Sequence, residues 1–153
     1  DSGEGLLLKG DGAGGFVSQF GHQSGIRVYG EQRGSAVGDL NGDGRSDLIV
    51  AQSKARPRLY MNTLGQTGLR LSLAGPAGNP LGQGATVRAM FADGSKGAAR
   101  LVGGNSGRYS QAAAGQTLGG AKRIRSVEVA WPSGMTTRVD VADPARPVVG
   151  KLK

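Results

Sequence analysis

The pattern of hydrophobic and polar positions changes near residue 69. Before that point, short apolar runs alternate with glycine-rich turns, which is typical of short strands. The pattern predicts a buried strand at 6–8, a half-exposed strand at 26–29, and further strands at 35–40, 48–51 and 58–61. A stretch of about 60 residues with short strands such as these is the size of one four-stranded propeller blade.

From residue 69 onward the strands become longer, and apolar and polar positions alternate more regularly. Glycine turns separate these runs, a pattern that predicts a β-sandwich, with strands at 69–73, 85–91, 97–102, 126–131 and 136–141. Alternation places Trp131 on the same face as Val127 and Val129. We therefore expect Trp131 in the core rather than on a ligand-stacking surface. The weak alanine run 112–114 is the best helix candidate.

The predicted fold class is all-β, with one propeller-blade-like four-stranded sheet followed by a β-sandwich-like domain. The predicted boundaries are a blade at 1–62, a linker at 63–68, the sandwich-like domain at 69–147 and a tail at 148–153. Twenty-nine glycines among 153 residues fit a chain with many turns and bulges. This length allows one ordinary domain or two small ones.

The nine residues from Asp39 to Asp47 place side-chain oxygens at positions 1, 3, 5 and 9 of a glycine-containing loop. Alternate side chains of such a loop turn inward, and Ca²⁺ takes six to eight oxygen ligands. The expected side-chain ligands are Asp39, Asn41, Asp43 and Asp47. The backbone carbonyl of Arg45, at position 7, would be a fifth ligand.

Two features distinguish this loop from an EF-hand. Position 12 is Val50 rather than a bidentate Glu, and the flanking residues predict strands rather than amphipathic helices. A solvated hairpin turn is the alternative, because Asp, Asn and Gly also favour turns. However, the chain has only 11 acidic residues against 19 basic ones, and three of the 11 lie in this loop. Their mutual repulsion favours a bound cation, and the all-oxygen ligand set favours Ca²⁺.

Composition restricts the other classes of partner. The absence of cysteine excludes disulfides and Cys-ligated zinc or iron–sulfur sites. The net charge is +8, but the basic clusters at 54–58 and 122–125 lack the interleaved aromatic residues that stack on bases, which argues against nucleic acid. An acidic polysaccharide remains open as a partner. No apolar run approaches the about 20 residues needed to span a bilayer.

The residues do not predict an enzyme. His22 is the only histidine and lies in a glycine-rich loop, so His-based triads have one candidate base and no cysteine nucleophile. The carboxylates at Asp93, Glu128, Asp140 and Asp143 show no spacing that singles out a pair for glycoside hydrolysis.

The chain resembles two known families that occur together. The first part is similar to an FG-GAP or VCBS repeat, the calcium-bearing blade of integrin-α-like propellers, in 10–16, 24–26, 34–39 and the 39–47 loop with 48–50 after it. The second part resembles the ASPIC/UnbV domain, found after such repeats in cartilage-acidic-protein-like and many bacterial secreted proteins. Its matching stretches are 79–87, 107–111 and 127–134.

The loop, the β-rich pattern and the resemblance together imply a non-catalytic, calcium-binding adhesion or assembly module, secreted or at the cell surface. The alternative is a carbohydrate-binding accessory module of a secreted enzyme. That alternative would use Trp131, Tyr60 and Tyr109 as exposed aromatic side chains.

A lone four-stranded sheet has two unpaired edges, and exposed edges associate unless something covers them. We therefore expect residues 1–62 to pack on the second domain, or to pair with a neighbouring copy or further blades. The partner would be a protein or a second copy of the chain. The arginines expected at this seam are Arg27, Arg33, Arg56 and Arg58.

Overall fold

The computed structural model describes residues 5–103, 107, 110–112, 115–119, 122–143 and 148–151. The all-β fold class is confirmed, since the helix α1 in these residues is a single turn, Gly21–Ser24. The strands are β1 (Leu7–Gly10), β2 (Phe16–Gln19), β3 (Gln32–Gly38), β4 (Asp47–Gln52), β5 (Ala55–Tyr60), β6 (Leu69–Ala74), β7 (Thr86–Phe91), β8 (Arg100–Leu101), β9 (Gln116–Leu118), β10 (Ile124–Ala130), β11 (Thr136–Asp140) and β12 (Val148–Lys151).

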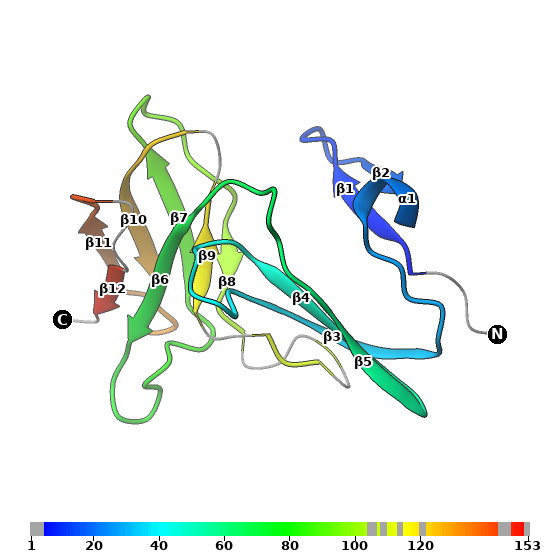
Figure 1. The fold of residues 1–153 in the computed structure, drawn as a ribbon. Helices are drawn as coiled ribbons and strands as arrows, with labels where there is room; N and C mark the ends of the chain where they lie inside the picture. Colours follow the sequence, from blue (N-terminus) through cyan, green and yellow to red (C-terminus); the bar gives the residue numbers. More distant parts are fainter. Residues whose placement is uncertain are drawn as a thin grey trace.

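The second half of the chain forms the sandwich-like domain (Figure 1). One sheet has the strand order β11-β10-β7-β8 and is antiparallel; the other has the order β12-β6-β9. Alternate residues of both sheets point between them, so that one face of each strand is buried. They form a single core of Leu69, Leu71, Leu73, Ala85, Val87, Ala89, Val102, Leu118, Ile124, Val127, Val129, Trp131 and Val141.

Trp131 lies in this core, as the alternation predicts, with 4% of its surface exposed. Its indole N–H donates a 2.9 Å hydrogen bond to Thr137 Oγ1, which satisfies the polar end of a buried ring. Gly82 lies against the ring at φ +65°, and a Cβ there would come within 2.9 Å of Leu73 Cβ and 3.1 Å of Trp131 Cζ3. Both the backbone conformation and the space therefore require glycine at this position.

Two strands of the smaller sheet differ from expectation. The segment assigned to a tail forms β12, which pairs in parallel with β6 from Val148 opposite Leu71 to Lys151 opposite Ala74. Strand β9 was not expected, and its Leu118 is buried in the core. The strand expected at 97–102 is only two residues long, while most of the helix candidate at 112–114 lies outside the described residues.

The first half of the chain forms two smaller sheets. Strands β3, β4 and β5 form a three-stranded antiparallel sheet, and β1 and β2 form a separate hairpin (Figure 1). The blade is thus divided between two sheets instead of forming one four-stranded sheet. The strand expected at 26–29 is irregular, with Val28 buried, and residues 6–8 are exposed rather than buried.

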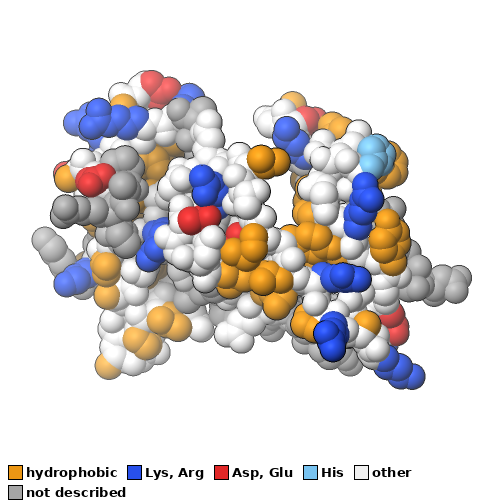
Figure 2. All heavy atoms as spheres, viewed as in Figure 1, with side chains coloured by type: hydrophobic (Ala, Val, Ile, Leu, Met, Phe, Trp, Pro, Cys, Tyr) orange, Lys and Arg blue, Asp and Glu red, His pale blue; other side chains and the backbone are white. Residues whose placement is uncertain are grey.

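Large exposed hydrophobic side chains are concentrated in this first half. They belong to Leu6, Leu7, Leu8, Phe16, Val17, Phe20, Tyr29, Val37, Leu40, Ile49, Leu59, Met61 and Leu64, whereas the second half contributes only Leu81, Leu101, Met135 and Val149 among the described residues. Figure 2 shows hydrophobic side chains gathered on the same side as β1 to β5. The large apolar side chains of the first half therefore lie mostly on the surface rather than in a core.

Candidate metal centre

The predicted metal loop connects β3 to β4 at the end of the blade sheet that lies nearest the sandwich (Figure 1). The last residue pair of the β3–β4 ladder is Gly38 opposite Asp47. Between them the chain turns sharply, with Gly42 at φ +80° and Gly44 at φ +81°. A Cβ on Gly44 would lie 2.6 Å from Thr67 Cγ2, so glycine also permits the close approach of the linker.

Asp39 shapes the first half of the loop. Its Oδ1 accepts a 2.8 Å hydrogen bond from Gly42 N, and its Oδ2 accepts one of 2.9 Å from Gly44 N. Such bonds from a carboxylate to backbone two or more residues ahead are the reason that Asp favours turns. The carboxylate thus faces the interior of the loop with both oxygens engaged by backbone donors.

Asn41 and Asp43 continue the same arrangement. Asn41 Oδ1 accepts from Asp43 N at 3.1 Å, and Asp43 Oδ1 accepts from Arg45 N at 2.8 Å. The Asn41 side-chain amide also donates to Asp43 Oδ2 at 3.0 Å. The amide of Asn41, followed by the Arg45 backbone N–H, lowers the pKa of Asp43 below its usual value, because both donors favour the ionised carboxylate.

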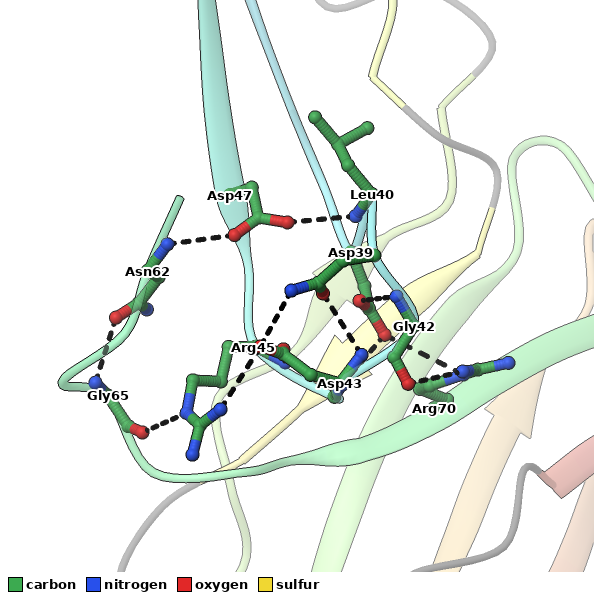
Figure 3. A network of polar contacts seen from close by, with 11 residues as sticks. Asp39, Leu40, Gly42, Asp43, Arg45, Asp47, Asn62, Gly65 and Arg70 are labelled. Carbon is green, nitrogen blue, oxygen red and sulfur yellow. Dashed lines mark hydrogen bonds and ion pairs between the residues drawn. The ribbon is translucent and has the colours of Figure 1, made fainter. Parts of the chain in front are cut away.

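Asp47 is the most buried of the predicted ligands, with 1% of its surface exposed. Its Oδ2 accepts from Leu40 N and its Oδ1 from Asn62 N, each at 2.9 Å. These two bonds join the start of the loop to the chain leaving β5 (Figure 3). Asp47 therefore holds three segments together: the start of the loop, the start of β4 and the chain that follows β5.

Two arginines lie on opposite sides of the loop (Figure 3). Arg45 Nη1 is 3.1 Å from Asp43 Oδ2, and its Nε donates to Gly65 O at 2.6 Å. Arg70, on β6, donates from Nη1 to Gly42 O at 2.9 Å, and its Nε is 3.7 Å from Asp39 Oδ2. Both guanidinium groups therefore offset the negative charge of the loop.

The predicted ligands thus lie on one turn of chain, but their side chains are bonded to neighbouring donors. Among the described residues, no three His, Asp or Glu side chains converge as a metal-binding group. The chemistry of the donor set nevertheless fits a hard cation, because three carboxylates, an amide oxygen and a carbonyl are all oxygen donors. Each carboxylate offers about four acceptor positions, and Asp47 uses two of them for the hydrogen bonds above.

A hollow of about 460 Å³ opens beside the loop. Asp39 and Asn41 line it on one side, and Arg70, Ser72 and Thr117 of the smaller sandwich sheet line it on the other. Small ions can therefore reach the loop from solvent on this side, as a metal site requires.

Sequence reasoning did not identify Asn62 and Arg70 as neighbours of the loop. Arg70 occupies an outward-facing polar position of an alternating strand, which is visible in the sequence. Its contact with Gly42, 28 residues earlier, depends on how the two halves of the chain are placed. No local pattern indicates that placement.

The other residues considered for function lie elsewhere. His22 is on α1 and stacks on Phe20 with ring centroids 5.9 Å apart. Tyr60 bonds through its hydroxyl group to the backbone of Arg27. Tyr109 lies outside the described residues.

Comparison with family models places two matches along the chain. Residues 33–55 match the FG-GAP repeat, and residues 75–148 match the family described as ASPIC and UnbV. The two matches follow one another in the order expected from the sequence, an FG-GAP repeat before an ASPIC and UnbV domain. The FG-GAP match includes β3 except for its first residue, the whole Asp39–Asp47 loop and β4. The ASPIC and UnbV match runs from just after β6 to the first residue of β12.

FG-GAP repeats are typical of extracellular or surface proteins, and the described residues of this chain are rich in β-strand. No curated protein matches the chain significantly. Within the described residues, no helix has the length and apolar character needed to cross a membrane.

Proposed function

We propose that this FG-GAP and ASPIC/UnbV chain is a non-catalytic, secreted or cell-surface module that binds calcium and takes part in adhesion or assembly. The observation that supports this most is the set of five oxygen donors on the β3–β4 loop, inside the segment that matches the FG-GAP repeat. The loop joins two strands rather than two helices, so a bound ion would act on the fold of the blade.

In this proposal, calcium is held by the side chains of Asp39, Asn41, Asp43 and Asp47 and by the carbonyl of Arg45. When bound, the ion would supply positive charge that offsets part of the negative charge of the three carboxylates on this turn. The residues themselves fix the turn between β3 and β4 and the start of the linker, through the bonds of Asp39 and Asp47 described above. The role is structural, and no bond in a substrate is made or broken.

Calcium is expected to raise the melting temperature, and Asp43→Ala is expected to remove the increase. An ion that binds only the folded state stabilises it by mass action, by about 2.7 kcal/mol at a free concentration one hundred times the Kd. Differential scanning calorimetry in millimolar calcium and in chelator measures the shift. Magnesium should give a smaller shift, because it requires near-ideal octahedral geometry.

Asp140→Ala is the matched control for this experiment, because it also removes one carboxylate but from an exposed side chain on β11. Its calcium-dependent shift should equal that of the unmodified chain. Identical melting curves of the unmodified chain in calcium and in chelator would contradict the calcium-binding proposal.

Assembly is supported by an apolar row across the blade sheet. Ala36, Ile49 and Leu59 lie directly opposite one another on β3, β4 and β5. Ile49 is 37% exposed and Leu59 55% exposed. Exposed apolar patches of this kind are typical of protein–protein contacts, so we propose this face as the contact with a protein partner or a second copy.

The edges of the blade sheet are less available than its face for contact with another chain. Strand β5 carries Pro57 between Arg56 and Arg58, and proline and charge on an edge strand hinder pairing with another chain. On β3, Ser35 N donates to Ser110 Oγ at 2.9 Å. Contact through side chains of the sheet face is therefore favoured over addition of a strand.

Leu59→Lys is expected to weaken association, because it places a charge in the centre of the proposed contact. Light scattering over a range of protein concentrations measures the average mass, and the unmodified chain should associate more strongly than the variant. Leu81→Lys, at a similarly exposed leucine of the second domain, is the control and should leave association unchanged.

Limited proteolysis within 63–68 supplies the complementary measurement. A stable monomer whose first 62 residues separate and stay folded alone would show that neither a partner nor the second domain is needed to cover the blade.

The carbohydrate-binding alternative has less support. Trp131, its principal candidate, is buried with its indole N–H bonded to Thr137, and the hydroxyl of Tyr60 is bonded to Arg27. Glycan binding that depends on an exposed aromatic side chain would have to use other residues.

A further inference from the structure

Two arginines connect the loop to the segments that follow the blade, Arg45 to the linker and Arg70 from β6 of the second domain. Each guanidinium group contacts a loop carboxylate and a backbone carbonyl: Arg45 contacts Asp43 and Gly65 O, and Arg70 contacts Asp39 and Gly42 O. Figure 3 shows the two groups approaching the loop from opposite sides. The Asp39 side chain is only 8% exposed, so the nearby positive charge of Arg70 is incompletely screened by solvent.

The same contacts attach the loop to the linker and to β6. Arg45 bonds to Gly65 in the linker, and Arg70 belongs to β6. The backbone adds Gly68 N to Gly44 O at 2.8 Å, and Asn62 accepts from Gly65 N at 2.8 Å. Among the described residues no blade strand packs extensively on a sandwich strand, so this junction is one of the places where the two halves meet, together with the hydrogen bond from Ser35 N to Ser110 Oγ. The charge state of the loop is thus connected to the attachment of one domain to the other.

We propose that Arg45 and Arg70 are internal counter-cations of the Asp39–Asp47 loop, so that cation binding by the loop is coupled to the attachment of the blade to the sandwich. The proposal rests on the proposed calcium binding. Without calcium, the guanidinium groups offset the loop charge and hold Gly65 and Gly42. With calcium bound, Asp43 and Asp39 would have the ion as their counter-charge, and Arg45 and Arg70 would hold the loop less tightly.

Electrostatics gives the direction and size of the effect. Arg45 contacts Asp43 and Arg70 contacts Asp39, so a divalent ion held by these carboxylates would be close to both guanidinium groups. Like charges at short distance repel even in a water-like dielectric. Replacing one arginine by neutral glutamine removes this repulsion and should tighten calcium binding roughly tenfold. The arginines therefore set the calcium affinity although neither side chain is a ligand.

The test compares Arg45→Gln and Arg70→Gln with the unmodified chain. Arg125→Gln, which removes the same charge from an exposed position on β10, is the control. Isothermal titration of chelator-treated protein with calcium chloride at fixed ionic strength measures the Kd. Hydrogen–deuterium exchange of peptides covering 63–68 measures protection of the Gly65 and Gly68 amides with and without calcium.

Arg45→Gln and Arg70→Gln are each expected to bind calcium roughly tenfold more tightly than the unmodified chain, and Arg125→Gln should bind it about as tightly as the unmodified chain. In chelator, Arg45→Gln should exchange faster over 63–68, and calcium should accelerate this exchange in the unmodified chain. If the unmodified chain binds calcium but neither arginine variant binds more tightly, the counter-cation role is wrong and the calcium-binding proposal stands. If the unmodified chain and all the variants fail to bind calcium, both are wrong.

Discussion

Trp131→Ala is expected to lower the free energy of unfolding of the sandwich domain by about 3–5 kcal/mol. The ring is 4% exposed and packs in the cluster formed by both sheets, so its removal leaves a cavity that close-packed neighbours fill only in part. Gly82 and Leu73 lie against it and would lose their contacts. Urea unfolding followed by far-ultraviolet circular dichroism measures the loss, since the variant no longer has a tryptophan.

Two further variants separate packing from hydrogen bonding at this position. Thr137→Val keeps the ring but leaves the indole N–H without its acceptor, at a cost of about 1–3 kcal/mol. Trp131→Phe keeps part of the ring and should fall between Trp131→Ala and the unmodified chain. A Trp131→Ala variant as stable as the unmodified chain would mean that the two sheets do not share one core around this ring.

The sandwich domain was largely predictable because its strands alternate with a period of two. Val127 and Val129 of β10 are fully buried, and the intervening Glu128 is not. A strand with one buried face and one face in water has alternating apolar and polar residues, and this alternation can be recognised in the sequence. The parallel pairing of β12 with β6 has no such trace, because the partners are separated by most of the domain and β12 is only four residues long.

The blade was predicted less well for a physical reason. Ile26–Tyr29 alternates like a strand, but its residues lie in an irregular segment in which Val28 alone is buried. The apolar run at 6–8 is equally consistent with a buried strand and with an exposed one, since apolar composition does not say what covers a strand. In the structure these residues are exposed, so a run that resembles a core strand forms part of the surface.

At the candidate site, too, contacts between residues close in sequence were predictable, and contacts between distant segments were not. Spacing along nine residues was sufficient to bring Asp39, Asn41, Asp43 and the Arg45 backbone onto one turn, because the turn is built from bonds between near neighbours. The contacts of Arg70 and Asn62 join segments far apart in sequence. Spacing cannot indicate these contacts, although they determine how the loop meets the rest of the molecule.

Asp47→Ala is expected to destabilise the blade even in chelator, by roughly 2–4 kcal/mol, because two backbone N–H groups lose their acceptor at once. Leu40 N and Asn62 N both bond to this carboxylate, which is 1% exposed. Asp43→Ala should cost much less without calcium, because its carboxylate is partly exposed. Hydrogen–deuterium exchange of peptides from β3, β4 and β5 in chelator measures the local free energy of opening, without requiring the whole chain to unfold in one step.

Asp47→Asn distinguishes hydrogen bonding from charge. The amide keeps one acceptor oxygen but places an N–H donor against either Leu40 N or Asn62 N, so one of the two bonds becomes a contact between donors. Its destabilisation should therefore approach that of Asp47→Ala, although the volume of the side chain is preserved. Equal protection of β4 in Asp47→Asn and in the unmodified chain, both in chelator, would mean that the two hydrogen bonds of Asp47 contribute little to the stability of the blade.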